Sequence, residues 1–232
     1  NCCEHFRRPL SVRESLMSVH FRVVLSLFVL SCAGSVYAED WPQFGRNQSR
    51  NAVSPEKNPP TWWQIEPRAK NGNDKSIPNK NILWAAALSH GLEYGQVSGD
   101  PVVVDGLVWV GSNHCDEKKV DNLAYSSALV CLDEKTGKEL YRHVSPRLTE
   151  VLEVGRWNSH SSSPLIEGER LWVVTNRCEI VCLDIGPRKK RTGEPRQLWK
   201  VDMRADLGVR ASTGFHYSRR CSVAGYKDWL YV

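Results

Sequence analysis

The stretch Pro101-Val-Val-Val-Asp-Gly-Leu-Val-Trp-Val-Gly-Ser-Asn113 decides the fold, because the chain repeats it as Pro164-Leu-Ile-Glu-Gly-Glu-Arg-Leu-Trp-Val-Val-Thr-Asn176. Pro, Trp, Val and Asn coincide at a constant offset of 63 residues. A third copy starts at Cys221 and runs to Val232. Self-similarity at a fixed period is typical of repeat architectures, so the chain is predicted to consist of copies of one supersecondary unit.

The similarity continues downstream of this stretch. The segment Ala128-Leu-Val-Cys-Leu-Asp133 matches Glu179-Ile-Val-Cys-Leu-Asp184, and each is followed by a Thr-Gly pair and then by an apolar–aromatic pair. The Thr-Gly pairs are Thr136-Gly137 and Thr192-Gly193, the apolar–aromatic pairs are Leu140-Tyr141 and Leu198-Trp199, and a further such pair, Leu83-Trp84, lies upstream. One unit therefore extends over the whole distance between two aromatic pairs.

Each unit reads as four short strands, because its apolar runs are rich in β-branched and aromatic residues and are separated by turn residues. Asp105-Gly106 is a typical hairpin turn, since Gly tolerates positive φ. The expected strands are 101–104, 107–111, 128–132 and 139–144 in the first unit, and 164–167, 170–175, 179–184 and 197–202 in the second. Four antiparallel strands per repeated unit predict an all-β fold, a β-propeller of four-stranded antiparallel blades.

The third-to-fourth strand region resembles a known family. Cys131-Leu-Asp133-Glu-Lys-Thr-Gly137-Lys-Glu-Leu-Tyr141 is similar to the docking motif of pyrroloquinoline quinone (PQQ) repeats, Ala-x-Asp-x-x-x-Gly-x-x-x-Trp. Cys131 stands in place of Ala and Tyr141 in place of Trp. The second copy, which is seven residues longer, is also similar. The structural docking residues are thus Cys131, Asp133, Gly137, Tyr141, Cys182, Asp184, Gly193 and Trp199.

The resemblance covers residues from about 40 to 232, because Asp40-Trp-Pro-Gln-Phe-Gly-Arg-Asn47 is similar to the opening segment of the same family. It implies that the motif aromatic wedges between blades and stacks on a neighbouring peptide at the Gly. It also implies a closed ring, commonly of eight blades. The family includes quinoprotein dehydrogenases and non-enzymatic outer-membrane assembly propellers, so the resemblance alone does not choose a function.

The units present are about two and a fraction blades, and a propeller needs at least four. The chain is therefore expected to be the N-terminal part of a larger propeller. The expected division is 1–16, a non-native translated extension; 17–38, a signal peptide; 39–80, a lead-in segment; 81–144, the first blade; 145–202, the second blade; and 203–232, the start of a third.

The first 38 residues have the composition of a secretory signal peptide. Met17 precedes a short cationic stretch with Arg22, an apolar run follows, and Val36-Tyr37-Ala38 fits the small-x-Ala cleavage pattern. The mature protein is expected to be periplasmic or secreted after cleavage near Ala38. Cys32 resembles a lipid-acceptor cysteine, and lipidation is the alternative that would tether the protein to a membrane.

Charge and cysteine content exclude some functions. A net charge of +5, spread along the chain, does not favour nucleic-acid binding. The one dense basic run, Arg188-Lys-Lys-Arg191, is expected to be a solvated hairpin tip. Five cysteines follow the cleavage site, an odd number that argues against a complete disulfide framework. Cys178 and Cys182 are expected on one face of one strand, too far apart to bond.

A ligand-binding face is expected where the long loops gather, because loops on a rigid scaffold commonly carry binding residues. These loops cover 85–99, 113–127, 145–163 and 203–220, and all lie at the same end of the blades. The residues that would line the face are Tyr94, His114, Arg156, Trp157, His160, Arg210, His216 and Tyr217. The alternative is that they are ordinary solvent-exposed loop residues. His114-Cys115-Asp116 could ligate a metal, but so short a cluster predicts no metal site.

These features favour a non-catalytic binding or scaffold module with an unknown protein or glycan partner and no catalytic residue. The alternative is a PQQ- and calcium-dependent quinoprotein alcohol or sugar dehydrogenase. The resemblance implies that such an enzyme holds Ca²⁺ with carboxylate and amide oxygens, uses an Asp base and a Trp under the quinone, and often has a vicinal disulfide. The segment after Ala38 has no vicinal cysteine pair. A hydrolase or lyase on the same scaffold is a third possibility.

Overall fold

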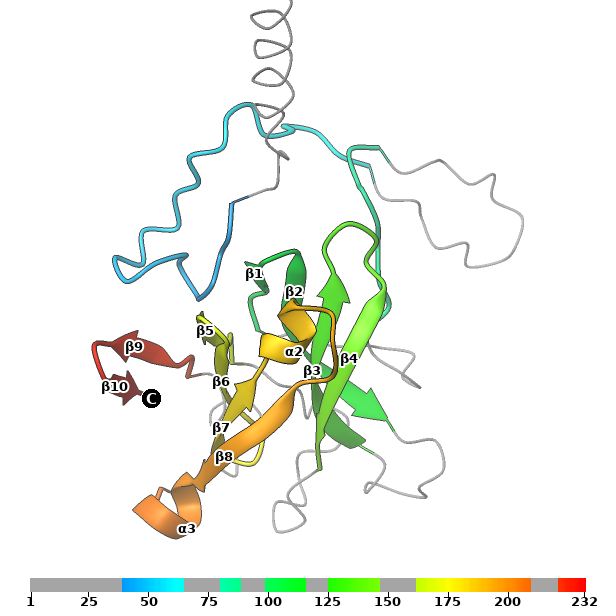
Figure 1. Ribbon diagram of the computed structural model, residues 1–232. Coiled ribbons are helices and arrows are strands. Elements are labelled where there is room, and N and C mark those ends of the chain that lie inside the picture. The colour runs from blue at the N-terminus through cyan, green and yellow to red at the C-terminus, as the bar shows by residue number, and fades with distance from the viewer. Residues whose placement is uncertain (1–38, 65–79, 89–98, 116–124, 147–161, 210–220) are drawn as a thin grey trace, which may run out of the picture. The chain divides into compact units, whose positions relative to one another are not determined.

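The computed structural model describes residues 39–64, 80–88, 99–115, 125–146, 162–209 and 221–232. Residues 39–232 form one compact unit. Its strands are β1 (Val102–Val104), β2 (Leu107–Cys115), β3 (Tyr125–Asp133), β4 (Glu139–Ser145), β5 (Leu165–Glu167), β6 (Arg170–Val174), β7 (Glu179–Asp184), β8 (Arg196–Asp202), β9 (Ala224–Tyr226) and β10 (Trp229–Tyr231). The short helices are α2 (Gly186–Lys189) and α3 (Met203–Leu207) (Figure 1).

The strands form antiparallel meanders, so the expected all-β class is confirmed. Strands β1 to β4 make the first four-stranded sheet and β5 to β8 the second, each in sequence order, while β9 and β10 make a two-stranded hairpin. In this topology the β1–β2 and β3–β4 turns lie at one end of a sheet, called here the turn end. The β2–β3 connection and the connections between sheets lie at the other, called the loop end.

The repeat seen in the sequence is also a repeat of strand register. Val102 pairs with Trp109 in the first hairpin, Leu165 with Trp172 in the second, and Ala224 with Tyr231 in the third. A β-bulge follows Cys131 in the first sheet and Cys182 in the second. Bulges kink a strand at a defined place, so the two sheets bend at matching positions.

Each four-stranded sheet has two apolar faces. The forward face of a sheet is here the face that turns toward the next unit along the chain, and the rear face is the opposite one. The forward face of the first sheet meets the rear face of the second in one core. Its members are Val102, Val104, Leu107, Trp109, Leu129, Cys131, Ile166, Leu171, Val173, Val181, Leu183 and Ile185. A second core lies on the rear face of the first sheet. A third lies between the forward face of the second sheet and residues Val223 and Leu230 of the third unit. Sheets covered on both faces need apolar residues at successive positions, which explains runs such as 107–110.

The lead-in segment adds to the edges that the first strands of the two sheets form. Trp41 and Val103 exchange two backbone hydrogen bonds, and the Pro42 carbonyl accepts one from the amide of Ile166. The first of these contacts is antiparallel, as in a sheet ladder. Residues 41–42 therefore join β1 and β5, the first strands of the two sheets.

Three local expectations differ from the structure. The hairpin β2–β3 includes 113–115 and 125–127, which the sequence predicts to be loop. These residues keep the ladder register, and Asn113, Ser126 and Ser127 are buried. Cys178 is not in a strand: it lies in the turn before β7 with φ of +59°. The basic run forms helix α2 and its C-terminal end, and its side chains are paired, as described below.

Candidate functional site

The predicted ligand-binding face falls almost wholly outside the described residues. Seven of its eight members lie there: Tyr94, Arg156, Trp157, His160, Arg210, His216 and Tyr217. The eighth, His114, belongs to β2, one residue before the end of that strand. In chain order, the segments that carry the seven residues precede β1, follow β4 or precede β9. The face therefore stays a prediction.

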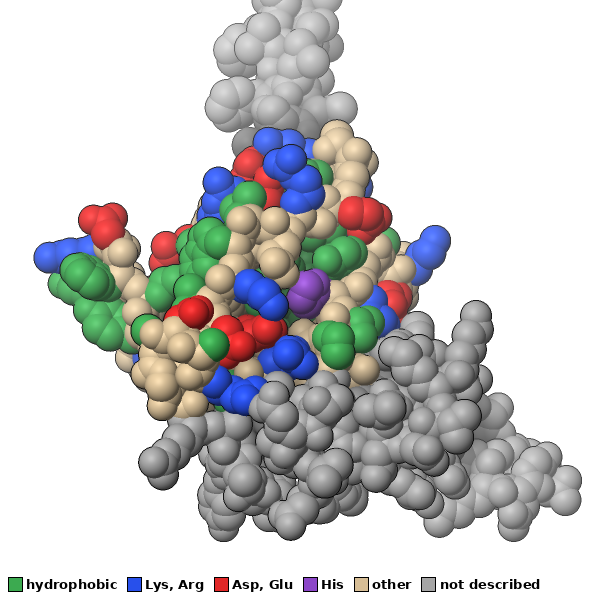
Figure 2. Space-filling model, turned by 90° about the horizontal axis from the view of Figure 1, so that it is seen from below, with side chains coloured by type: hydrophobic (Ala, Val, Ile, Leu, Met, Phe, Trp, Pro, Cys, Tyr) green, Lys and Arg blue, Asp and Glu red, His purple; other side chains and the backbone are tan. Residues whose placement is uncertain are grey.

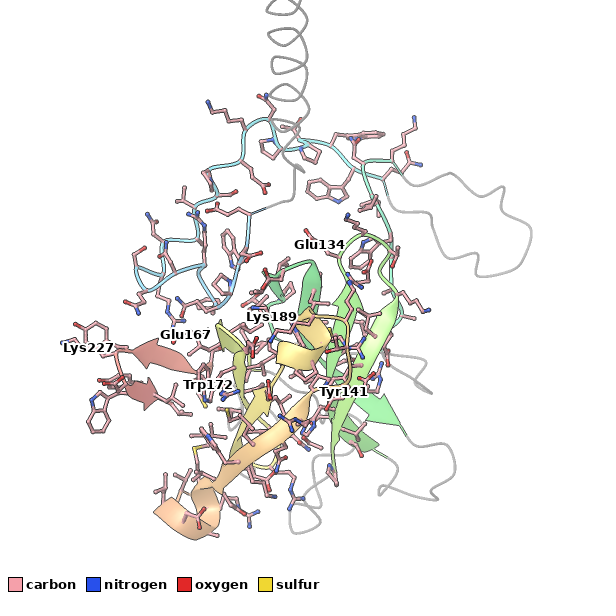
Figure 3. The ribbon with its side chains drawn as sticks, in the orientation of Figure 1. Glu134, Tyr141, Glu167, Trp172, Lys189 and Lys227 are labelled. Carbon is pink, nitrogen blue, oxygen red and sulfur yellow. The ribbon has the colours of Figure 1, made fainter. Side chains whose placement is uncertain are left out.

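The docking residues occupy matching places in the two sheets. Cys131 pairs across the strands with Tyr141, and Cys182 pairs with Trp199. A small residue opposite an aromatic one leaves room for the ring on the sheet surface. The Tyr141 ring also contacts the ring of Trp109 edge-on, with centroids 6.2 Å apart (Figure 3 labels Tyr141). Tyr141 therefore belongs to the apolar contacts between the sheets, whereas the matching Trp199 is 40% exposed.

The two motif aspartates hold the third-to-fourth turns. Asp133 accepts hydrogen bonds from the backbone amide and the hydroxyl of Thr136, and Asp184 accepts one from the amide of Gly186. The bond from Thr136 lowers the pKa of Asp133, and the bond from Arg196 lowers that of Asp184. Ionised carboxylates at these positions stabilise the turns because they accept several hydrogen bonds.

Gly137 is the place where an aromatic ring meets a turn. Its φ is +68°, and a Cβ built on it would lie 2.5 Å from the ring of Trp84. The Trp84 indole N–H donates to the carbonyl oxygen of Glu134 over 2.7 Å. A Cβ built on Gly193, its counterpart in the second sheet, would meet only Pro187 within 4 Å, at 3.6 Å. The close approach of ring and glycine is therefore made by Trp84 on Gly137.

The buried cysteines are poor nucleophiles. Burial raises the pKa of the Cys131 thiol to about 12, and burial also raises the pKa of Cys182. The thiolate is the reactive form of cysteine, so neither thiol is poised for chemistry near neutral pH. Both act as small apolar residues opposite aromatic rings.

The turn end carries ion pairs between the sheets. Lys189 of α2 lies 2.6 Å from the carboxylate of Asp105 in the β1–β2 turn, and Arg191 lies 3.1 Å from that of Asp133 (Figure 3 labels Lys189). Within the second sheet, Lys190 contacts Glu169, and Arg188 contacts Glu194. All four cations of the run thus face a carboxylate, and two of them connect the sheets.

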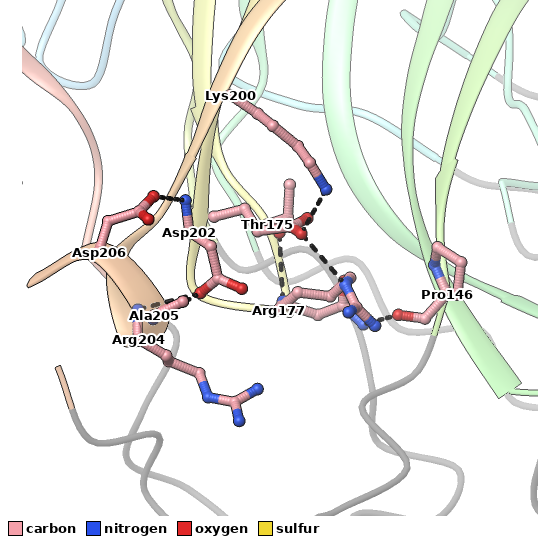
Figure 4. A network of polar contacts seen from close by, with 10 residues as sticks. Pro146, Thr175, Arg177, Lys200, Asp202, Arg204, Ala205 and Asp206 are labelled. Carbon is pink, nitrogen blue, oxygen red and sulfur yellow. Dashed lines mark hydrogen bonds and ion pairs between the residues drawn. The ribbon is translucent and has the colours of Figure 1, made fainter. Parts of the chain in front are cut away.

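The described part of the loop end carries a different polar network (Figure 4). Glu179, whose side chain is only 7% exposed, accepts from Lys200 at 2.8 Å and from Arg177 at 3.4 Å. The Asn176 amide donates to the carbonyl of Pro146, which follows β4 of the first sheet. These contacts place a buried carboxylate with two cations next to the seam between the sheets.

His143 of β4 lies near this network. Burial lowers its pKa, while the nearby negative charge of Glu179 acts in the opposite direction. The space-filling view of this end shows basic and acidic side chains on the same face as a histidine (Figure 2). This end therefore carries side chains of both charges, and His143 itself is neutral near neutral pH.

Sequence reasoning missed this network. The available signal was a mismatch between the copies: Glu179 stands where the first copy has the apolar Ala128. A charged residue at a position that is apolar in another repeat indicates a local polar contact. Asn176 matches Asn113 in the repeat, but the match alone does not predict its hydrogen bond to the Pro146 carbonyl.

A serine ladder connects the first strands at the loop end. The amide of Asp100 donates to the Ser163 hydroxyl at 3.0 Å, and the amide of Ser163 donates to the Ser222 hydroxyl at 3.1 Å. Each of these residues lies two positions before the first strand of its unit. The same hydrogen bond thus recurs from one unit to the next along the inner edge.

The described residues give two negative findings. Among them, no cluster of three or more His, Cys, Asp or Glu side chains could hold a metal ion. No described helix is both long and apolar enough to cross a bilayer. A scan against protein-family models and a search of the curated proteins found no match to this chain.

Proposed function

We propose that residues 39–232 form the first blades of an exported β-propeller of PQQ-like repeats that acts as a binding or scaffold module. Its ligand, a glycan or a protein segment, binds at the loop end. The single observation that carries this proposal is the difference between the two ends of the sheets. The turn end has short turns whose charges are used within the molecule, and the loop end has long connections.

The turn end leaves little for a ligand to bind. Its turns are Asp105-Gly106, residues 134–138, Gly168-Glu169 and the α2 region. Lys189 donates to the Gly168 carbonyl and also contacts Asp105. The lead-in segment covers the inner edges near the same end, where Asp40 accepts from the amide of Asp105. Polar groups that already have partners contribute little to a new interface.

The propeller itself is supported by the repeated packing. The first and second sheets meet forward face to rear face, and the second sheet meets the third unit in the same order. A series of sheets related in this way curves into a ring when its connections stay short on the inside, as propeller blades do. The serine ladder supplies such a short inner edge.

The experiment compares binding at the two ends. The chain from Glu39 is titrated on an array of neutral and acidic oligosaccharides, and the variants Trp157→Ala and His160→Ala are compared with Lys190→Ala at the turn end. We expect the loop-end variants to lose binding by at least tenfold and the turn-end variant to retain it. Equal losses at both ends would contradict the proposal.

The same sample separates a binding module from a quinoprotein dehydrogenase. It is titrated with PQQ and Ca²⁺ while quinone absorbance and dye-linked oxidation of alcohols and sugars are followed. We expect no stoichiometric quinone binding and no turnover. Stoichiometric binding with turnover would replace the scaffold function by the enzymatic one.

A further inference from the structure

Glu39, where the described part of the chain begins, is held both at its backbone nitrogen and at its side chain. Its N–H donates to the Glu56 carboxylate over 2.9 Å, and its own carboxylate pairs with Arg46. Arg46 also donates to the carbonyl oxygen of Val53 over 2.8 Å. These contacts close the first part of the lead-in segment into a loop with residues 39 and 56 at its two ends (Figure 1).

The contacts with the first sheet begin at the next residue. Asp40 accepts a hydrogen bond from the β1–β2 turn, and Trp41 exchanges two backbone hydrogen bonds with β1. Residue 39 is also the first residue of the compact unit 39–232. The expected cleavage pattern ends at Ala38. The predicted cut and the start of the fold therefore coincide.

Cleavage of the bond between Ala38 and Glu39 places a positive charge at the nitrogen that faces Glu56. Hydrolysis by a signal peptidase transfers the OH of water to the Ala38 carbonyl carbon and the other hydrogen to the Glu39 nitrogen. The new carboxyl group then ionises, and the new amine takes up a proton. An α-amino group has an ordinary pKa of about 7.7–8.0, so it is mostly charged at pH 7.

The surroundings of Glu56 are rich in carboxylates. Burial raises the pKa of Glu134, the charges of Asp40, Asp133 and Glu56 act in the same direction, and Lys135 opposes them. These carboxylates are therefore close enough to repel one another. An opposite charge beside a carboxylate favours its ionised form. An ammonium group at residue 39 thus meets a negative surface, whereas a neutral amide uses only the hydrogen bond.

We propose that Glu56 binds the α-ammonium group that signal-peptide cleavage creates on Glu39, and that this ion pair stabilises the docking of the lead-in segment on the first sheet. Arg46 binds the side chain of the same residue, so both charged groups of Glu39 are held. The inference rests on the export that the proposed function includes. It does not rest on a ligand at the loop end, so the two can fail separately.

A comparison of two N-termini tests the ion pair. One form of the protein starts at Glu39. The other starts at Ala33, so its ammonium group lies six residues away and residue 39 keeps a neutral amide. Glu56→Gln is made in both forms, because glutamine still accepts a hydrogen bond but carries no charge. Hydrogen exchange of the Trp41 amide, which donates to Val103 over 2.6 Å, reports the docking of the segment.

The ion pair should affect only one of the two forms. We expect Glu56→Gln to speed the exchange about two- to fivefold when the protein starts at Glu39, as for an exposed ion pair, and to leave it unchanged in the longer form. Added salt should reduce the effect. Glu169→Gln is the matched control, because its carboxylate pairs with Lys190 in the second sheet. Equal effects of Glu56→Gln in both forms, or no effect in either, would overturn the inference.

The first residue of the protein purified from its export compartment tests the cleavage. We expect N-terminal sequencing to begin at Glu39 with an unmodified amine. Any other first residue, including a lipid-modified Cys32, would overturn the inference, because no ammonium group would then face Glu56. Neither experiment depends on binding at the loop end, which Trp157→Ala and His160→Ala test.

Discussion

Gly137 shows how one residue type can serve two purposes. Its positive φ suits a residue without Cβ, and the absence of Cβ gives the Trp84 ring its place. Cys131 works in a similar way, since a small side chain opposite Tyr141 leaves room for the ring in the core between the sheets. At the residue scale, the docking residues act through the size and shape of their side chains and not through chemical reactivity.

Replacing Gly137 by Ala is expected to destabilise the fold through both causes. Gly168 is the matched control, because its φ is +56° and a Cβ there would meet nothing within 4 Å. We expect Gly168→Ala to cost about 1 kcal/mol, the backbone cost alone, and Gly137→Ala to cost about 1–3 kcal/mol more from overpacking. Denaturant unfolding measures both. Equal costs would show that Trp84 does not occupy this site.

His143 predicts an acid-sensitive stability. Its folded pKa is lowered from 6.5, so the unfolded chain binds more protons between the two pKa values. Its contribution is fully present above pH 6.5 and is lost as the pH falls toward the lowered value. Unfolding free energy measured between pH 8 and pH 5 should therefore fall in acid, and His143→Gln should remove most of that fall. An unchanged slope in the variant would mean that another group causes it.

The element that matters most for the contact between the sheets at the turn end is α2. A helix this short has little intrinsic stability, so its contacts hold it in place. Pro187 suits its first turn. Lys189 and Arg191 connect the helix to the first sheet through ion pairs with Asp105 and Asp133. The seven-residue insertion in the second copy of the motif thus provides an inter-sheet contact and not only a longer turn.

A double-mutant cycle between Lys189 and Asp105 measures this contact. Lys189→Met and Asp105→Asn, singly and together, should give a coupling of about 0.2–1 kcal/mol, because the pair is partly exposed. The coupling should shrink at high salt. Lys190→Met is the control, since Lys190 pairs within its own sheet and should show no coupling to Asp105. Zero coupling at low salt would argue against a stabilising contact between Lys189 and Asp105.

The sequence was sufficient for the strands, because Asp-Gly turns and apolar runs are local signals. It was not sufficient for α2, whose residues Gly186 and Pro187 disfavour a helix interior and which forms through tertiary ion pairs. The extension of β2 and β3 was missed because buried serines, such as Ser127, look like loop residues in the sequence. Glu179 was missed because its partners, Arg177 and Lys200, come together only when β7 and β8 pair.

At the scale of the whole molecule, residues that match in the sequence repeat at an offset of 63 also occupy matching faces of the two sheets. Val103, Val108 and Val110 on the rear face of the first sheet match Ile166, Leu171 and Val173 on the rear face of the second. Each unit thus presents the same rear face to whatever precedes it. The forward side of the third unit is exposed at Tyr226, Trp229 and Tyr231. Exposed apolar residues in such a group commonly mark an interaction surface.

The serine ladder predicts how the units depend on one another. Ser163→Ala removes the hydroxyl that accepts from Asp100, and Ser222→Ala removes the one that accepts from Ser163. Each should cost about 0.5–1.5 kcal/mol of unfolding free energy, the usual value of one intramolecular hydrogen bond. Ser49→Ala, in an exposed turn of the lead-in segment, is the control and should cost less. No difference from this control would indicate that the ladder does not stabilise the inner edge.

The most direct test of the stacked-repeat architecture is a methyl NOE spectrum of the chain from Glu39 with labelled Val, Leu and Ile. The account predicts NOEs from Val104 and Leu129 to Val173 and Leu183, and from Leu165 to Val223 or Leu230, with none between the first sheet and the β9–β10 hairpin. NOEs from Val108 or Val110 to the second sheet, or no NOEs between the sheets, would contradict the forward-to-rear stacking of the repeats.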